Sequence, residues 1–263
     1  TSEPLTLEDC LDALIDYRGK TPKKTDEGIP LITAKVVKSG RIETPDEFIT
    51  ESDYAQWMTR GYPELGDVVL TTEAPLGEVG QIKYLPVALA QRIVTLRGKK
   101  GVLDNGYLLY LLQTEEMQSK LVGRASGTTV IGIKQSELRK VELRLPPLPE
   151  QRAIADTLGA LDDRIDNLRQ TNATLQAIAA GLFKSWFVDF DGVRPEDMQE
   201  SDLGLIPKGW RIGSLADLCE LNASKWTAKR HPPTVRYIDL SGVSSNRIET
   251  VSDFDFDEAP SRA

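Results

Sequence analysis

A long apolar heptad is the feature that most constrains how this chain can fold. From Leu145 the sequence reads LPPLPEQRAIADTLGALDDRIDNLRQTNATLQAIAAGLFKSWF. Apolar residues recur at alternating spacings of three and four from Ile154 to Trp186, which predicts a helix with a coiled-coil seam. The prolines at 146, 147 and 149 suit the approach to a helix but not its interior. We therefore expect one spacer helix over residues 149–190.

The predicted seam occupies heptad positions a and d. Position a is taken by Leu158, Ile165, Asn172, Ala179 and Trp186, and position d by Ile154, Leu161, Leu168, Leu175 and Leu182. A buried amide at an a position, here Asn172, lowers stability but disfavours wrong registers. Residues 149–187 would span roughly 55 to 60 Å at 1.5 Å per residue, a length that suits a spacer. The alternative interpretation is a core helix of an ordinary α domain.

Composition indicates one large or two modest globular domains, since the 263 residues are 40% hydrophobic and 27% charged. A membrane-spanning apolar run and a signal peptide are both missing from the sequence, so we expect a cytoplasmic protein. Cys10 and Cys219 lie far apart, which favours reduced thiols over a disulfide framework or a zinc site. The net charge of −8 is unusual for a free-standing nucleic-acid binder, although basic residues cluster at 18–24 and 35–41.

The chain divides into four predicted segments. Residues 1–148 alternate β-branched runs, helical spacings and glycine-rich turns, which predicts an α+β domain with a small curved sheet. Within it we expect strands near 29–37, 67–86 and up to 98, a helix capped by Thr50 or Ser52 and ending at Gly61, a helix over 105–125 and a closing strand at 137–146. After the spacer helix, residues 191–206 resemble an exposed linker and residues 207–263 the beginning of a second domain.

An internal repeat supports the second domain. The tetrapeptide RIET occurs at Arg41 and again at Arg247, 206 residues later, and the same offset places Ile32 over Ile238. With a small gap, LEDCLDAL near the start aligns with LADLCELN from Leu215. The second copy stops well short of the first, so the chain is expected to be truncated in its second domain.

Several segments carry a family resemblance. LPPLPEQRAIADTL, LFKSWFVDFDGVRPE and LGLIPKGWRIGSLADL, together with YRGKTP, TTEAPLG and QRI, are similar to segments of specificity subunits of type I restriction-modification systems. The resemblance implies a non-catalytic subunit whose two target-recognition domains each read half of a split DNA site. It also implies modification (methyltransferase) subunits docked on the helical spacer, with S-adenosylmethionine bound in those partners, and motor and nuclease subunits in the full complex.

The missing second spacer helix is a departure from that pattern. A leucine seam left in water forfeits roughly 1.5 to 3 kcal/mol for each side chain that could have been buried. We therefore expect a homodimer through the spacer helix, with two-fold symmetry and antiparallel helices.

Candidate DNA-contacting residues lie in loops that mix basic and small polar side chains, because reading DNA requires both phosphate and base-edge contacts. The loops are Tyr17–Lys24, Thr71–Gly77 and Ala125–Lys134, and each has an alternative interpretation as an ordinary surface loop or turn. The candidates are Tyr17, Arg18, Lys20, Thr21, Lys23, Lys24, Thr33, Lys35, Thr71, Thr72, Glu73, Arg92, Ser126, Thr128, Thr129 and Lys134.

Catalytic chemistry is not expected in this chain. His231, the single histidine, stands in KRHPPT without a nucleophile around it. The sequence contains neither a GxxxxGK[ST] loop nor an amino-methyltransferase Asn/Asp-Pro-Pro-Tyr/Phe motif, and its carboxylates lack metal-ligand spacing. We expect no cofactor or metal in this chain, and the functional alternative to DNA reading is a coiled-coil scaffold without DNA specificity.

Overall fold

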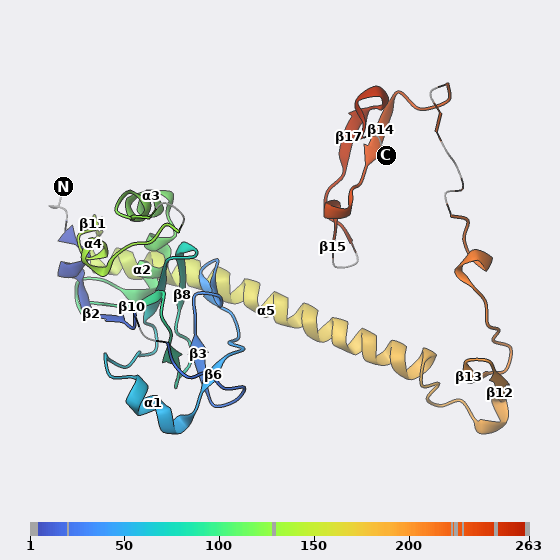
Figure 1. The fold of residues 1–263 in the computed structure, drawn as a ribbon, viewed down its shortest axis with the longest axis horizontal. Helices are drawn as coiled ribbons and strands as arrows, with labels where there is room; N and C mark the ends of the chain where they lie inside the picture. Colours follow the sequence, from blue (N-terminus) through green and yellow to red (C-terminus); the bar gives the residue numbers. More distant parts are fainter. Residues whose placement is uncertain are drawn as a thin grey trace. The chain divides into compact units, whose positions relative to one another are not determined.

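The computed structural model describes residues 5–19, 21–127, 130–221, 223, 226–227, 229–244 and 247–260. Two compact units make up the chain, Thr1–Ala177 and Ile178–Ala263, and each is described by itself (Figure 1). The first unit holds a mixed α+β fold and most of the long helix.

An antiparallel four-stranded sheet is the centre of the first unit. Its strand order is β2 (Leu11–Asp16), β10 (Ile93–Gly98), β7 (Val68–Thr72) and β8 (Leu76–Gln81). In β7, Val68 and Leu70 belong to one hydrophobic core and Val69 to another, because successive side chains point to opposite faces of a strand. The sheet is therefore buried on both faces, which explains why β7 is apolar throughout rather than alternating.

Helices and a short strand pair cover one face of the sheet. They are α2 (Asn105–Leu112), α3 (Glu115–Gly123), α4 (Gln135–Leu138) and the pair β1 (Leu5–Thr6) with β11 (Glu142–Leu143). The single helix predicted over 105–125 is wrong, because the Thr114 hydroxyl accepts a hydrogen bond from Met117 N (3.3 Å) and starts a second helix. The predicted closing strand over 137–146 is reduced to β11, and residues 137 and 138 belong to α4 instead.

The other face carries smaller strands and one helix. A three-stranded sheet, β6 (Phe48–Ile49), β3 (Ile29–Ile32) and β9 (Ala88–Leu89), packs with the hairpin β4 (Val37–Lys38) and β5 (Arg41–Ile42). Helix α1 (Glu51–Trp57) begins as predicted, with the Thr50 hydroxyl accepting from Asp53 N (3.2 Å). It ends at Trp57, before the predicted stop at Gly61.

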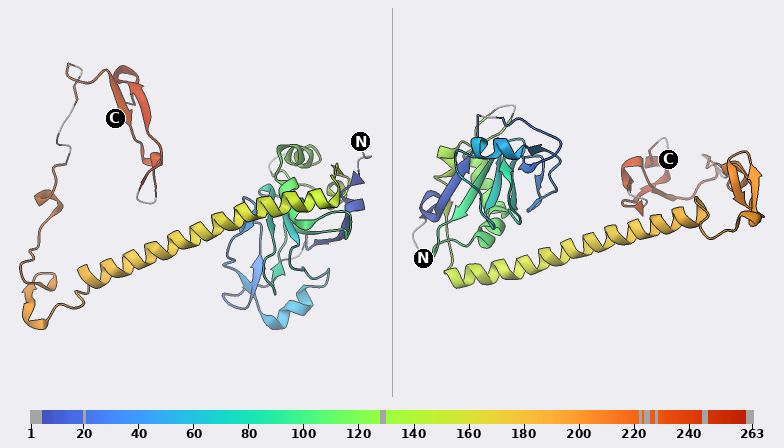
Figure 2. Two further views of the ribbon diagram at one scale, coloured as in Figure 1. Left: turned by 180° about the vertical axis from the view of Figure 1, so that it is seen from behind. Right: turned by 90° about the horizontal axis from the view of Figure 1, so that it is seen from below.

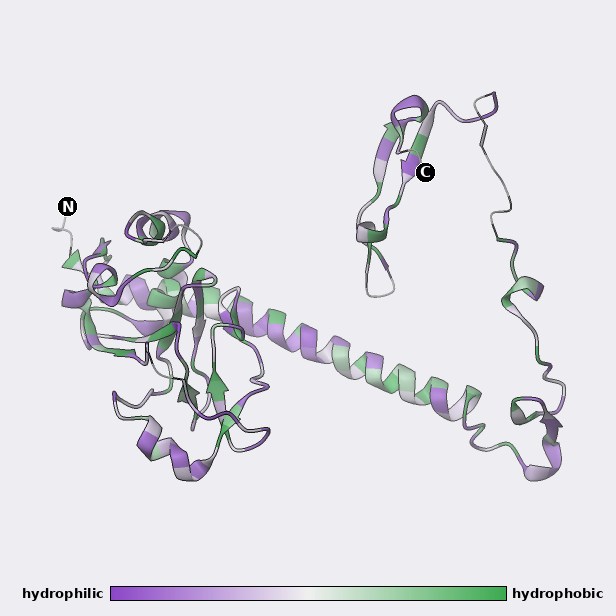
Figure 3. Ribbon diagram, in the orientation of Figure 1, coloured by the Kyte–Doolittle hydropathy of each residue, from purple (hydrophilic) through white to green (hydrophobic). Residues whose placement is uncertain are grey.

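The spacer helix is confirmed as one uninterrupted element. Helix α5 runs from Leu148 to Phe187, 40 residues. Residues 167–177 of α5 are all exposed, whereas Gln151 near its start is buried. The ribbon of α5 alternates between hydrophilic and hydrophobic residues along its length, as an amphipathic helix should (Figure 3). Among the described residues, every helix is too short or too polar to cross a membrane.

The second unit consists of hairpins and 3₁₀ turns. The predicted linker contains a turn at Pro195–Asp197 and a hairpin of β12 (Met198–Ser201) with β13 (Gly204–Pro207). Further along are a turn at Leu215–Asp217, the pair β14 (Thr234–Tyr237) with β17 (Ser252–Asp255), the hairpin β15 (Val243–Ser244) with β16 (Arg247–Ile248), and turns at Leu240–Gly242 and Phe256–Glu258.

The internal repeat is present in three dimensions. Hairpins β4–β5 and β15–β16 have the same strand register at positions 206 residues apart. The bond from Glu43 N to Val36 O (2.7 Å) recurs from Glu249 N to Gly242 O (2.8 Å). The two RIET segments therefore form equivalent turns.

The aligned segments near Leu7 and Leu215 also share a turn. Asp9 accepts from Thr6 N (3.0 Å), and Asp217 accepts in the same way from Ser214 N (2.6 Å). Hydrogen bonds from the Thr6 hydroxyl and backbone lower the pKa of Asp9, and those from the Ser214 backbone and hydroxyl lower the pKa of Asp217. Both carboxylates therefore remain charged caps.

Candidate nucleic-acid interface

Four loops that are distant in sequence meet at one end of the four-stranded sheet. Thr72 at the end of β7 accepts from Ile133 N (2.9 Å) and donates its own N–H to Arg92 O (2.9 Å). The guanidinium of Arg18, just after β2, donates to Ile133 O (2.8 Å). The YRGKTP, TTEAPLG and QRI segments and the loop before α4 therefore converge.

Glu73 and Arg92 form the exposed ion pair of this loop cluster. Arg92 Nε lies 3.2 Å from Glu73 Oε1, with side chains 53% and 43% exposed. Arg92 holds a left-handed backbone (φ 71°), an uncommon conformation for a residue with a side chain and one often found at functional sites. Gly132 pairs with Glu73, and a Cβ there would lie 3.1 Å from Glu73 Cβ, so glycine permits the close approach.

A shallow cavity of about 320 Å³ gathers five of the predicted DNA-contacting residues, together with Ala74 and Gln91. The five are Thr21, Lys24, Thr33, Lys35 and Arg92. This was the feature that sequence alone could not show, because these residues come from three separate segments.

The cations of this cavity are balanced by carboxylates. Lys24 lies 2.7 Å from Glu47, and Lys35 is hydrogen-bonded to Asp46. That hydrogen bond raises the pKa of Lys35 and lowers the pKa of Asp46. With Arg92 paired as well, the cavity presents charge pairs rather than a net positive field, so phosphate must compete with carboxylates already in place.

Three predicted DNA-contacting residues are buried and cannot contact DNA in this structure. Tyr17 is 1% exposed and donates its hydroxyl to Gly61 O (3.0 Å) while stacking on Trp57. Thr71 is fully buried and accepts from Glu78 N (2.9 Å), and Thr72 is 2% exposed. The prediction is wrong for these side chains, because the packing of the first unit covers them.

The remaining predicted residues are dispersed. Lys23, Ser126 and Lys134 are exposed, and Lys23 lies beside Trp57 rather than in the cavity with Lys24. Lys20, Thr128 and Thr129 lie outside the described residues. The same part of the chain shows no group of three or more His, Cys, Asp or Glu side chains able to hold a metal ion.

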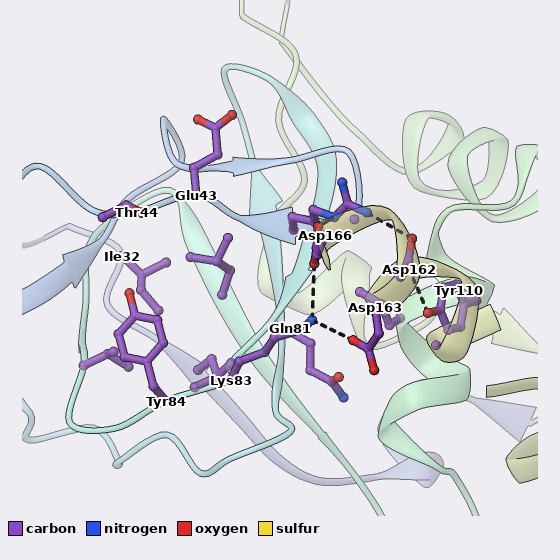
Figure 4. Close-up of a pocket in the computed structure, with 17 residues that line it drawn as sticks. Ile32, Glu43, Thr44, Gln81, Lys83, Tyr84, Tyr110, Asp162, Asp163 and Asp166 are labelled. Atoms are coloured by element: carbon purple, nitrogen blue, oxygen red, sulfur yellow. Dashed lines mark hydrogen bonds and ion pairs between the residues drawn. The ribbon is translucent and has the colours of Figure 1, made fainter. Parts of the chain in front are cut away.

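A second site, which the sequence did not predict, joins the first unit to α5. It surrounds a cavity of about 600 Å³ whose lining includes Ile42, Tyr84, Leu109 and Gly159. Figure 4 shows Asp162, Asp163 and Asp166 of α5 facing Lys83 and Tyr110.

Ion pairs and one phenol hydrogen bond hold this junction. Arg41 Nε lies 3.0 Å from Asp166 and its Nη2 lies 3.3 Å from Asp162, while Lys83 Nζ lies 3.4 Å from Asp163. Tyr110 donates its hydroxyl to Asp162 (2.9 Å), and burial, followed by that bond, raises the pKa of Tyr110. The phenol therefore remains a donor.

The face of α5 at this junction is not the seam. With Leu158 at position a, Asp162 falls at e, and Gly159 and Asp166 fall at b. The seam residues remain largely open: Leu158, Leu161, Ile165, Leu168, Leu175 and Leu182 are 37 to 58% exposed. Views from two further directions show that α5 begins beside the strands and short helices of the first unit and then extends away from them (Figure 2). The helix therefore packs one face against its own unit and leaves an adjacent apolar face exposed.

Comparison with known proteins matches residues 3–177 to the type I restriction modification DNA specificity domain. The chain belongs to this family. The chain is 33% identical over 207 residues to the type I restriction enzyme MjaIX specificity subunit of Methanocaldococcus jannaschii. That alignment covers 77% of this chain and 47% of that protein. It is 30% identical over 141 residues to the HindI specificity subunit of Haemophilus influenzae, covering 53% of this chain and 30% of that protein.

The chain thus spans about half the length, or less, of these curated relatives. Among solved structures, it resembles a crystal structure of a type I restriction-modification system S subunit from M. genitalium, with a TM-score of 0.51 and 19% identity. That alignment covers 76% of this chain and 57% of the other. The predicted α+β fold with a long helix is confirmed.

Proposed function

We propose that this chain is the DNA sequence-recognition subunit of a type I restriction-modification complex and reads one half of a bipartite site. The observation that carries the proposal is the convergence of the predicted loops at one sheet end, in a chain that belongs to the specificity family. The subunit would position DNA and would supply no catalytic residue.

The cavity has the two kinds of contact that reading requires. Lys24, Lys35 and Arg92 would exchange their carboxylate partners for phosphates, fixing the register of the duplex. Thr21 and Thr33 offer short hydroxyls, and Glu73 offers an acceptor for a cytosine amino group. Because each cation is already paired, we expect weak DNA affinity for the isolated subunit.

The partners follow from the family. Modification subunits would dock on α5, supply most phosphate contacts and carry S-adenosylmethionine, and restriction subunits would complete the complex. Such a complex would act on DNA in the cytoplasm.

The test is selection of binding duplexes from a randomised pool by the full chain mixed with its cognate modification subunit and S-adenosylmethionine. We expect an enriched half-site and an affinity that falls with salt concentration. Glu73→Gln should change which bases are enriched, whereas Gln170→Glu, on an exposed position of α5, should not. A pool that remains random would refute the proposal and favour the scaffold function.

We further propose that α5 pairs with α5 of a second copy in an antiparallel arrangement. When a two-fold axis is placed beside residue 170, every a position meets a d position of the other copy. The pairs are Leu158 with Leu182, Ile165 with Leu175, Asn172 with Leu168, Ala179 with Leu161 and Trp186 with Ile154. Shifting the pairing by one heptad loses at least one of these five pairs.

Light scattering of the purified chain tests the homodimer. We expect the mass of a dimer at micromolar concentration and of a monomer for Leu168→Glu, because that substitution places a carboxylate in the seam beside the axis. Gln170→Glu is the matched control, since position f faces away from the seam. A monomeric native chain would overturn the pairing.

A further inference from the structure

The RIET segment is kept in both copies of the internal repeat, as is the candidate DNA-reading residue Thr21, which recurs as Thr227, whereas Thr33 and Lys35 are not kept. Arg41 and Arg247 occupy the same position in equivalent hairpins. At the same offset, Lys35 corresponds to Ser241 and Thr33 to Asp239. Under the proposed function, two units that read different half-sites should differ where they contact bases and agree where they perform the same structural task. A shared structural task is one reason for an arginine to be repeated.

The contacts of Arg41 show what that task is. Its guanidinium bridges Asp162 (3.3 Å) and Asp166 (3.0 Å), two carboxylates one turn apart on α5. Its side chain is 21% exposed. A guanidinium can satisfy two carboxylates at once because its donors form a fixed fork. With both partners in place, Arg41 is not available to a phosphate.

The backbone of Arg41 is held just as closely by the central sheet. A Cβ at Gly80 of β8 would lie 2.7 Å from the carbonyl carbon and oxygen of Arg41, so β8 approaches the hairpin directly. Strand β8 begins at Leu76, immediately after the loop that carries Glu73. A short path of rigid backbone therefore connects the reading loops, through β8 and Arg41, to the spacer helix.

We infer that Arg41 is a positioning residue. Its bridge to Asp162 and Asp166 fixes the angle between α5 and the part of the first unit that precedes α5, residues 5–147, which we call the recognition unit. By holding that angle, it determines where the reading loops lie relative to the axis of α5. Lys83 adds a second, weaker ionic contact from the strand-end loop. The inference rests on the proposed function for its biological consequence but not for its geometry.

Distance distributions between two spin labels test the inference on the full chain. Labels at exposed Ser52 and Ala173 report the recognition unit and the helix, in a background in which exposed Cys219 is changed to serine. We expect a narrow distribution for the native chain and at least a twofold broader one for Arg41→Ala. Arg41→Lys should be intermediate, because a lysine ammonium is a point charge without the fork. Arg169→Ala is the matched control, since Arg169 pairs with Asp166 on the same helix.

A second variant guards against a simple folding defect in the hairpin. The double substitution Asp162→Asn and Asp166→Asn removes the clamp from the helix side and should broaden the distribution equally. An unchanged narrow distribution in both variants would overturn the inference.

The DNA arm uses duplexes recovered by selection, with the gap between half-sites altered by one base pair. The native complex should bind the duplex with the selected gap at least tenfold more tightly than the duplex with the altered gap. Arg41→Ala should reduce this affinity ratio severalfold without changing the half-site that is read. If the native complex binds no specific duplex, the proposed function fails, while the spin-label result still decides the role of Arg41.

Discussion

Replacing Gln151 by leucine should detach the start of α5 from the first unit. The Gln151 side chain is 1% exposed, and its amide makes three hydrogen bonds to backbone groups. It accepts from Asp104 N (3.0 Å) and donates to Val102 O (3.0 Å) and Pro146 O (2.9 Å). Leucine nearly matches the volume of glutamine but can neither donate nor accept.

The expected cost follows from the three groups left without partners. An unsatisfied buried polar group costs about 1 to 3 kcal/mol, and burying the leucine side chain offsets about 1.5 to 3 kcal/mol of the total. We therefore expect Gln151→Leu to lower the free energy of unfolding of the first unit by about 3 kcal/mol.

Urea unfolding followed by tryptophan fluorescence measures this loss. Trp57 reports the first unit because its indole N–H donates to Leu89 O (2.9 Å), whereas Trp210 and Trp226 of the second unit are 45 and 52% exposed and should respond little. Gln170→Leu, at an exposed position of α5, should change the free energy of unfolding by less than about 0.5 kcal/mol. A loss below about 1 kcal/mol for Gln151→Leu, with an unchanged m value, would refute the reasoning.

Four further outcomes are expected. Arg92→Ala should weaken specific DNA binding by the assembled complex and lower the salt slope by about 1, measured by fluorescence anisotropy at several salt concentrations. Asp46→Asn should have the opposite effect on that slope because it frees Lys35. The Lys35 hydrogen bond lowers the pKa of Asp46, so the ion pair is fully formed above the ordinary carboxyl pKa and is lost only as pH falls through the lowered value. This pair should therefore cause no change in the DNA affinity of the native complex between pH 6 and 8. Asn172→Leu should strengthen dimerisation about tenfold but admit other helix registers, as sedimentation and cross-linking would show.

Local signals predicted α5, its proline approach and the start of α1 well. Prolines, a heptad and a Thr50 cap act within a few residues, so their outcome does not depend on tertiary structure. The break at Thr114 was missed because apolar spacing continued across it while a competing cap restarted the helix. The helical spacing of the apolar residues was correct, but the Thr114 hydroxyl set the boundary between α2 and α3.

The candidate site was predicted only in part, for a physical reason. Threonine and tyrosine suit DNA contacts, yet Thr71, Thr72 and Tyr17 are buried, and burial depends on packing that residue type does not reveal. The docking residues Arg41 and Gln151 had signals in the sequence, since RIET recurs and the PEQ motif starts the helix. Their function became visible only when their partners on α5 and near α2 were placed beside them.

The contacts between α5 and the rest of the first unit end early on the helix, so the remainder of the helix can tolerate changes in its length. Asp166 is the last α5 residue in the ion pairs with Arg41 and Lys83, and the helix continues for 21 residues after it, up to and including Phe187. An insertion of seven residues there would add about 10.5 Å of helix, or roughly three base pairs of duplex, without altering the clamp or the reading loops. Lineages of this family could therefore acquire new gap lengths through duplications in one short stretch of coding sequence, while the half-sites that they read stay unchanged.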